Sequence, residues 1–507
     1  MNFSPRFLFA PMPPVVAVPT PWRRRALAPR AWASWGRGAL TPQSWPTRSS
    51  ALRAALVLAL GSTAAASEIP ALLKERLHSV VAVEFVVETE SERRPVTALG
   101  TVIDDQGTVV LPGTAIPQAI GIDQIHDFKV YPAGGGDEFS AEYLGLDLLT
   151  GWHFVRADEK LRAQLVPVTR FAAADAPAPE LGDEIWGIGL RNKDEDFAPY
   201  LLSSRIALIT NLPNATAIAA EDVAGPGLPV FNRAGQLVGL AQNSYGQNYL
   251  LFSRGQNATP VVLVNVEESS VIQLAADVVP FFKRIPKNPN GRPIAWLGVY
   301  GLQPVDPDVA KLLKLGRQSG LVLSDIMDGS PAARAGLRDG DVVLALDGQP
   351  LPHLKPDRVV GDYFGREILR HQPGEVVTLA LLRGTERQEV KVTLGDEPKM
   401  PREAARRYFE RLGLTVREFL KVDTIVNRTK PGEEGGVVAH FLKPNGPAAV
   451  AGLRPDDWIR EIDGVPVKDF ADAVGKLAVV ETDRTHAEIV LLASRGGETQ
   501  VLRIKLN

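Results

Sequence analysis

The residues that could perform serine-type catalysis are few in this chain. Such catalysis needs a hydroxyl nucleophile, an imidazole base and a carboxylate that orients the base. The sequence has no Cys, which excludes thiol nucleophiles, disulfides and thiolate metal sites. Asp147, His153 and Ser244 are the candidates for a triad, but their arrangement along the chain matches no familiar geometry. We therefore expect His153 to be an ordinary core or surface histidine and Asp147 to be a turn residue.

Motifs for metals and cofactors are weak. The acidic pairs at 104–105 and 456–457 are typical of solvated turns, because neither has the ligand spacing of a calcium loop. The glycine run at 134–136 lacks the strand-to-helix setting of a phosphate-binding loop and is interpreted as a flexible loop. The sequence predicts no metal site and no cofactor.

Charge is distributed unevenly along the chain. Residues 1–66 contain eight Arg, no Lys and no acidic residue, so their removal takes the formal net charge from −3 to −11. A chain this acidic has no general attraction to phosphate backbones, and no basic stripe with interleaved aromatic residues offsets the charge. We expect no nucleic-acid partner.

The N-terminal region has the pattern of an export signal. Arg48 and Arg53 precede the apolar run 54–60, and small residues follow up to Ser67, with a plausible cleavage site after Ala66. An uncleaved anchor is the alternative, although the apolar run is shorter than the roughly 20 residues that span a bilayer. Residues 1–47 lack any periodicity. We expect a disordered extension and signal peptide over 1–66, and a periplasmic or secreted mature protein.

The elements after Ser79 are short runs of Val, Ile, Leu, Phe and Thr between turn residues. This spacing predicts an all-β sandwich or barrel that extends to about Val264. A stretch with helical periodicity, VIQLAADVVPFFKRI, follows, and the segment PKNPNGRP marks a linker near residue 290.

An internal repeat lies beyond the linker. The segment from Gly329 to Gly348 returns, without a gap, as the segment from Asn445 to Gly464. In the first copy Ser330 is a good N-cap, Pro331 suits the first helical position, and Gly336 can take the left-handed C-terminal conformation. A strand and a tight Asp-Gly turn then follow in both copies, at 342–348 and at 458–464. The same short helix and hairpin are therefore expected twice.

These two segments resemble the PDZ domains of HtrA-type proteases, which carry a "GSPAxxAGLxxGDVIxxxDG" block after the peptide-binding groove. Each copy is preceded by a candidate carboxylate-binding loop. In PDZ domains a peptide adds a strand to a sheet edge, while loop amides hold its terminal carboxylate. The resemblance implies peptide-binding residues Leu297, Gly298, Val299 and Tyr300 in the first copy, and Leu412, Gly413, Leu414 and Thr415 in the second.

The preceding β region is similar to the protease domain of the same family. The segments TALGTVIDDQGTVVLPGTAIP, EYLGLDLLTGWHFVRAD and AGPGLPVFNRAGQLVGL match the blocks that carry the family's His, Asp and Ser. This comparison puts Thr114, Gly151 and Pro226 at the three triad positions. None of the three residues can play its part, and Pro226 also lacks the backbone N–H that normally serves as one oxyanion-hole donor.

A shift in this comparison does not restore the triad. No Ser lies between Ser204 and Ser244, and no His lies between His78 and His126. The resemblance therefore implies a degenerate protease domain without catalytic residues.

The expected fold is mainly β: a chymotrypsin-like double β-barrel followed by two α+β PDZ domains. We expect the protease-like domain at 67–285 and the PDZ domains at 290–397 and 400–507.

Three functions remain open. The first is a non-catalytic envelope protein that binds polypeptide C-termini or unfolded segments as a chaperone, adaptor or quality-control factor. The second is an active serine endopeptidase with a non-standard site. The third is a structural subunit that co-assembles with an active protease, and the family resemblance also implies a homotrimer.

Overall fold

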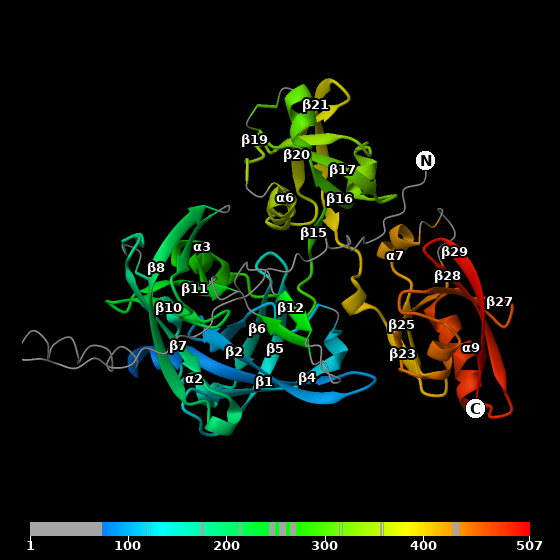
Figure 1. Cartoon of the computed structure of the whole chain (residues 1–507), viewed down its shortest axis with the longest axis horizontal. Coiled ribbons are helices and arrows are strands. Elements are labelled where there is room, and N and C mark those ends of the chain that lie inside the picture. The colour runs from blue at the N-terminus through cyan, green and yellow to red at the C-terminus, as the bar shows by residue number, and fades with distance from the viewer. Residues whose placement is uncertain are drawn as a thin grey trace, which may run out of the picture. The chain divides into compact units, whose positions relative to one another are not determined.

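The computed structural model describes residues 74–506 with short internal gaps (Figure 1). The residues outside the description are 1–73, 119, 174–176, 212–213, 243–248, 253–259, 264–269, 314, 317, 355–356, 358, 428, 430–434 and 507. The predicted signal peptide and N-terminal extension lie outside the described residues. Among the described residues, no helix is long and apolar enough to cross a membrane.

The first six strands form a closed barrel in the order β1-β2-β3-β6-β5-β4. In β1 the side chains alternate between two apolar clusters, as the two-residue period of a strand requires. Val81, Val83 and Phe85 join one cluster, whereas Val80 and Ala82 join a cluster that also contains residues of the second barrel. The strands are β1 Val80–Glu88, β2 Arg93–Val102, β3 Thr108–Leu111, β4 Ile125–Pro132, β5 Phe139–Asp147 and β6 Trp152–Ala157.

A second closed barrel follows, in the order β10-β11-β14-β9-β8-β7. Its strands are β7 Glu184–Leu190, β8 Pro199–Asn211, β9 Ala215–Ala219, β10 Pro229–Asn232, β11 Leu237–Gln242 and β14 Val271–Leu274. A separate hairpin comprises β12 Tyr249–Phe252 and β13 Pro260–Leu263. The two barrels confirm the mainly β fold expected from the spacing of the short apolar runs.

The stretch with helical periodicity at 271–285 is only partly helical, and its first residues belong to the second barrel. It begins as β14, because Val271 and Ile272 pair with β9 on one side and β11 on the other. The chain then forms α3 Ala275–Val278 and the 3-10 helix η5 Val279–Lys283. The other short helices of the barrel region are η1 Leu77–Ser79, η2 Ile122–Gln124, α2 Glu159–Arg162, η3 Val168–Phe171 and η4 Lys193–Glu195.

The first repeat is a sheet in the order β16-β17-β18-β20-β21, packed against the helix α6. Its elements are β15 Ala295–Trp296, β16 Val299–Pro304, α4 Pro307–Leu312, β17 Leu321–Ile326, α5 Pro331–Arg334, β18 Val342–Leu346, β19 Gln349–Pro350, α6 Val359–Leu369, β20 Val376–Arg383, β21 Glu386–Thr393 and β22 Gly395–Asp396.

The second repeat is a sheet in the order β23-β24-β25-β26-β28-β29, packed against α9. Its elements are η6 Pro401–Glu403, β23 Arg406–Phe409, β24 Leu414–Glu418, α7 Lys421–Val426, β25 Val437–Leu442, α8 Pro447–Val450, β26 Trp458–Ile462, β27 Val465–Pro466, α9 Phe470–Thr482, β28 Glu488–Arg495 and β29 Glu498–Lys505.

The local predictions for the repeat are confirmed. The Ser330 hydroxyl accepts the Ala333 N–H at 3.1 Å, as expected of an N-cap, and Gly336 has a φ of 78° after α5. The Asp347-Gly348 turn has both residues at positive φ, 47° and 77°, which is the geometry of a two-residue hairpin turn.

Candidate functional site

Thr114, Gly151 and Pro226, the residues that the resemblance puts at triad positions, lie on loops that meet between the two barrels. A Cβ placed on Gly113 would lie 2.4 Å from the carbonyl oxygen of Gly151, so the loop carrying Thr114 touches the turn that carries Gly151. A Cβ placed on Gly227, the residue after Pro226, would lie 2.9 Å from the Cδ atom of Pro112. The Thr101 hydroxyl donates to the Gly227 carbonyl oxygen at 2.7 Å and holds this contact between the barrels.

This junction has little catalytic chemistry. Thr114 and Pro226 are exposed, and Gly151 has no side chain. A neutral threonine hydroxyl cannot replace an imidazole base, and a proline offers neither a nucleophile nor a backbone donor for an oxyanion. Thr114, Gly151 and Pro226 thus supply neither an imidazole base, a carboxylate nor a serine nucleophile at this junction.

His153 is a buried histidine of the first barrel. It lies on β6 with 3% of its surface exposed, and its Nδ1 atom is 2.9 Å from the Tyr143 hydroxyl. Burial lowers the pKa of His153 to about 4, so the imidazole is neutral at pH 7. The residue is therefore a hydrogen-bonded core histidine, in agreement with the interpretation from the sequence.

Asp147 has structural partners. Its carboxylate accepts the Thr150 N–H at 3.1 Å and the Thr150 hydroxyl at 2.8 Å, and it pairs with the Arg284 guanidinium at 3.0 Å. These contacts close the turn that leads to Gly151 and tie it to the end of η5. Asp147 is the expected turn residue and directs no charge at His153.

Two serines that follow β11 in the sequence, Ser244 and Ser270, differ in what the structure describes. Ser244, the third candidate, lies outside the described residues. Ser270 was missed by the sequence analysis because it belongs to no motif. It is 4% exposed, and its hydroxyl accepts the Val223 N–H at 3.1 Å and lies 3.3 Å from an Asp222 oxygen. Ser270 thus fixes the base of the loop that carries Pro226 and is not itself accessible.

The two candidate carboxylate loops are built alike. The Leu297 carbonyl oxygen accepts the Ala332 N–H at 2.9 Å, and the Leu412 carbonyl oxygen accepts the Ala448 N–H at 3.0 Å. Each loop is thereby bonded to the short helix that follows the second strand after it, α5 in one repeat and α8 in the other. The loop glycines, Gly298 and Gly413, have positive φ values of 88° and 61°.

The strand that follows the first loop has a free edge. β16 is the terminal strand of its sheet, Val299 is half-buried at its start, and Tyr300 is 44% exposed. The helix α6 lies along this strand, and a Cβ added to Gly361 of α6 would lie 3.7 Å from the Leu302 carbonyl oxygen. Gly365 is one turn further on the same helical face, and a Cβ there would meet nothing within 4 Å. The sequence analysis missed this pair of glycines.

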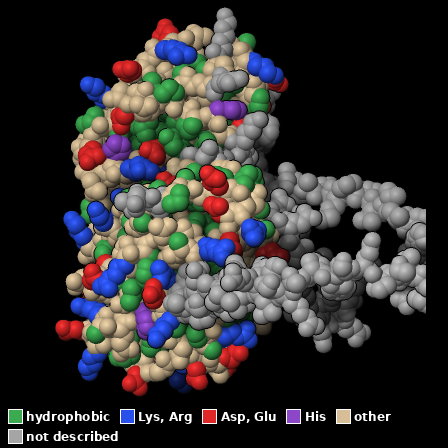
Figure 2. Space-filling view, turned by 90° about the vertical axis from the view of Figure 1, so that its left-hand side faces the viewer, with side chains coloured by type: hydrophobic (Ala, Val, Ile, Leu, Met, Phe, Trp, Pro, Cys, Tyr) green, Lys and Arg blue, Asp and Glu red, His purple; other side chains and the backbone are tan. Residues whose placement is uncertain are grey.

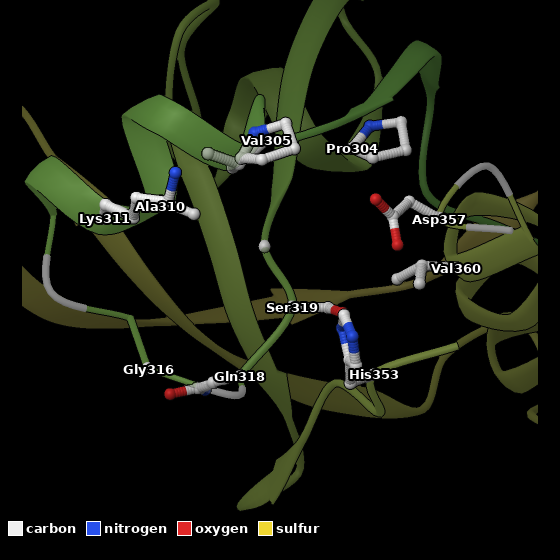
Figure 3. A pocket seen from close by; sticks show the side chains of 12 residues that line it. Pro304, Val305, Ala310, Lys311, Gly316, Gln318, Ser319, His353, Asp357 and Val360 are labelled. Carbon is white, nitrogen blue, oxygen red and sulfur yellow. The ribbon is translucent and has the colours of Figure 1, made fainter. Parts of the chain in front are cut away.

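A cavity of about 560 Å³ lies at the far end of β16 from the Gly298 loop. Figure 3 shows Pro304 and Val305 on one side of it and Ser319 beside His353 on the other. Lys311 of α4 and Asp357 stand on different walls, so the cavity offers groups of both charges as well as apolar surface. This cavity adjoins the groove between β16 and α6, because Pro304 and Val360 belong to those elements.

The strand that follows the second loop is placed differently. Leu412 and Leu414 are buried on either side of Gly413, and Thr415 is also buried. β24 is an internal strand, because it pairs with β23 as well as with β25. The two predicted grooves are therefore not equivalent.

The surface carries mixed charge. Figure 2 shows Lys and Arg side chains interspersed with Asp and Glu over the described part of one face. Among the described residues, no group of three His, Asp or Glu side chains is arranged to hold a metal ion.

Comparisons with known proteins find PDZ domains and similarity to periplasmic serine endoproteases. Models of the PDZ domain match residues 300–394 and 442–490. The chain is 27% identical over 401 residues to a "Probable periplasmic serine endoprotease DegP-like" of Pseudomonas fulva, covering 68% of this chain and 76% of that protein. It is 30% identical over 294 residues to the protein of the same description from Ectopseudomonas mendocina, covering 55% and 54%. Among solved structures, the HtrA-type protease AlgW with tripeptide matches with a TM-score of 0.44 and 18% identity, over 65% of this chain and 97% of that one.

Two six-stranded barrels followed by two PDZ domains define the chain as a chymotrypsin-like protein with C-terminal peptide-binding modules. More particularly, it is similar to members of the HtrA-type, DegP-like serine protease family, and it carries two PDZ domains.

Proposed function

We propose that this protein is a non-catalytic member of its family that binds polypeptide ends in the periplasm. The periplasmic assignment follows the description of its DegP-like relatives and agrees with the export signal predicted at 1–66. The observation that supports the proposal is that the loops carrying Thr114, Gly151 and Pro226 meet between the barrels, because the family resemblance puts these three residues at the triad positions.

The binding role belongs to the first PDZ domain. The free edge of β16 offers unpaired backbone groups to an added strand, and the loop at 296–299 lies at the start of that edge. The ligand class is a polypeptide with an apolar C-terminal residue and a free carboxylate. Chaperone, adaptor and quality-control roles all use this chemistry.

The test of catalysis uses the mature chain with unfolded casein and a fluorophosphonate probe. The proposal predicts no cleavage above background and no labelled serine. A serine labelled in proportion to casein cleavage, in protein purified free of host proteases, would instead support an endopeptidase with a non-standard site.

The test of binding compares a peptide that ends in a free apolar residue with the same peptide amidated at its C-terminus. Loss of a charge-assisted hydrogen bond costs about 1.5 to 3 kcal/mol, so amidation should weaken binding by roughly one to two powers of ten. Equal affinity for both forms would refute carboxylate recognition. Size measurement of the protein alone and mixed with an active relative distinguishes this role from that of a structural subunit.

A further inference from the structure

The second PDZ domain has a strand where a PDZ ligand would bind. β23 pairs antiparallel with β24 along its length, from Arg406 opposite Arg417 to Phe409 opposite Leu414. The strand of the first domain that corresponds to β24 is β16, and it is the terminal strand of its sheet. The edge of β24 that would accept a peptide is thus already paired with four residues of the same chain.

The helix beside the groove encloses this strand. α9 packs against β23, in the way that α6 packs against β16 in the first domain. The buried residues of α9 belong to the same apolar cluster as Phe409, which is 1% exposed. Its members from the helix are Ala473, Leu477 and Val480. β23 therefore lies between the helix and the sheet, which is the place of a peptide in a PDZ domain.

Phe409 takes the position of a ligand's last side chain. It stands directly opposite Leu414, the residue after the loop glycine, and it shares a cluster with both Leu412 and Leu414. The strand direction is also that of an added peptide, because its C-terminal end is the end that lies at the loop.

The polar groups of the loop are satisfied from within the chain. The Gly413 N–H donates to the Glu410 carbonyl oxygen at 3.1 Å. The Arg411 guanidinium donates to carbonyl oxygens near the end of α9, those of Val480, Asp483 and His486. Arg411, a cation that could attract a carboxylate, instead caps the C-terminus of the helix.

We infer that residues 406–409 are an internal ligand of the second PDZ groove. The sequence Arg-Arg-Tyr-Phe fills the groove by strand addition, with Phe409 in the apolar pocket and the Glu410 carbonyl oxygen at a loop amide. An external polypeptide reaches this groove only by displacing β23, and the best competitor has an aromatic last residue with basic residues before it. The inference rests on the proposed peptide-binding function for its interpretation of the groove.

The first test uses the absence of cysteine from the chain. Arg407→Cys combined with Val416→Cys places two thiols at directly opposed positions of β23 and β24. The full mature protein should form this disulfide on mild oxidation, as measured by thiol titration and peptide mass mapping, while each single variant keeps its free thiol. Two free thiols in the folded, oxidised double variant would overturn the inference.

The second test opens the pocket. Phe409→Ala should let the full protein bind a free peptide ending in Arg-Arg-Tyr-Phe at least tenfold more tightly than the wild type does, with no gain for the same peptide ending in Ala. Ile504→Ala, which removes a buried side chain of β29 in the same domain, is the matched control and should give no gain. Absence of any gain in folded Phe409→Ala would also overturn the inference.

The two tests remain decisive if one variant misfolds. Should Phe409→Ala fail to fold, the disulfide result decides alone. Failure of the proposed function would appear separately, as loss of peptide binding at the first domain, where residues 406–409 take no part.

Discussion

Gly361 on α6 faces Leu302 on β16 so closely that a Cβ added to the glycine would lie 3.7 Å from the Leu302 carbonyl oxygen and 3.8 Å from its Cβ. These are ordinary contact distances, so an alanine fits there and a larger side chain would fill the space next to the strand. Gly365, on the same face, has nothing within 4 Å. The width of the first groove therefore depends on two helical glycines.

We predict that Gly365→Leu lowers the affinity of the full protein for an apolar C-terminal peptide at least tenfold. The added side chain occupies the open part of the groove, and the helical backbone accepts it without strain. Isothermal titration measures the effect. Gly475→Leu, a change to a glycine of α9 that also meets nothing within 4 Å, is the matched control and should leave this affinity unchanged. Unchanged binding by Gly365→Leu would place the ligand elsewhere.

Gly361→Ala should retain binding and raise the stability of the domain by about 0.5 to 1 kcal/mol, because alanine loses less backbone entropy than glycine in a helix. Thermal unfolding measures the change.

Gly298→Val, a more obvious choice for blocking the groove, is a poor test. Gly298 has positive φ, and a Cβ there would lie 2.2 Å from the Ser330 Cβ, so the variant would disturb the loop and the N-cap of α5 together.

Restoring a nucleophile alone should not restore catalysis. We expect Pro226→Ser to show no casein hydrolysis above background, because it lacks both a base and an orienting carboxylate. The triple variant Thr114→His, Gly151→Asp and Pro226→Ser has room at position 151, where an added Cβ meets nothing within 4 Å, although the φ of 71° there strains a side chain. Its hydrolysis should remain far below that of an active relative in the same assay. Hydrolysis by Pro226→Ser alone would show that another base serves this site.

The first barrel should lose stability on mild acidification because of His153. Burial depresses its pKa from an ordinary 6.5 to about 4, so between these pH values the unfolded chain takes up a proton and the folded chain does not. The neutral, buried His153 therefore contributes fully to the free energy of unfolding above pH 6.5. This contribution decreases as the pH falls toward 4, by about 3 kcal/mol in total. Urea unfolding at pH 7 and pH 5 measures this decrease, followed by the fluorescence of Trp152 on β6 in a variant whose other tryptophans are replaced by phenylalanine. His153→Gln should remove most of the difference between the two pH values.

An ion pair recurs at the same place in both repeats. Arg383 donates to the Asp341 carboxylate at 2.8 and 2.7 Å, and Arg495 donates to Asp457 twice at 2.6 Å. Burial opposes the ionisation of Asp341, but hydrogen bonds from Arg383 and the Arg338 N–H outweigh it and hold the pKa below its usual value.

We therefore predict that Asp341→Asn destabilises the first PDZ domain by about 1 to 3 kcal/mol at pH 7, because the arginine loses a charged partner. A lowered pKa contributes stability above the unfolded value near 4, and this contribution decreases as the pH falls below that value. The difference between Asp341→Asn and the wild type in thermal unfolding should thus shrink from pH 7 to pH 3. Asp457→Asn tests the equivalent pair in the second domain.

The sequence by itself determined the class of this protein. Short apolar runs predicted the barrels. The repeat, with its Ser330 cap and Asp-Gly turns, predicted a short helix and a hairpin in each copy, because caps and tight turns depend on a few neighbouring residues. The resemblance to HtrA-type proteases identified the two copies as PDZ domains. The sequence also has no Ser between Ser204 and Ser244 and no His between His78 and His126, and the prediction of altered triad positions follows from these gaps together with the family resemblance.

Only the tertiary structure decided which of the two strands, β16 or β24, lies at the edge of its sheet. β16 and β24 follow loops of similar sequence. The residues around each loop do not indicate whether another strand, such as β23, pairs with β24. That outcome depends on how residues 406–409 pack against α9, a contact between segments far apart in the chain. The structure likewise decided that Gly361 and Gly365 lie on the face of α6 toward β16, and that His153 is buried. Both properties depend on how the elements pack, which residue type and spacing do not specify.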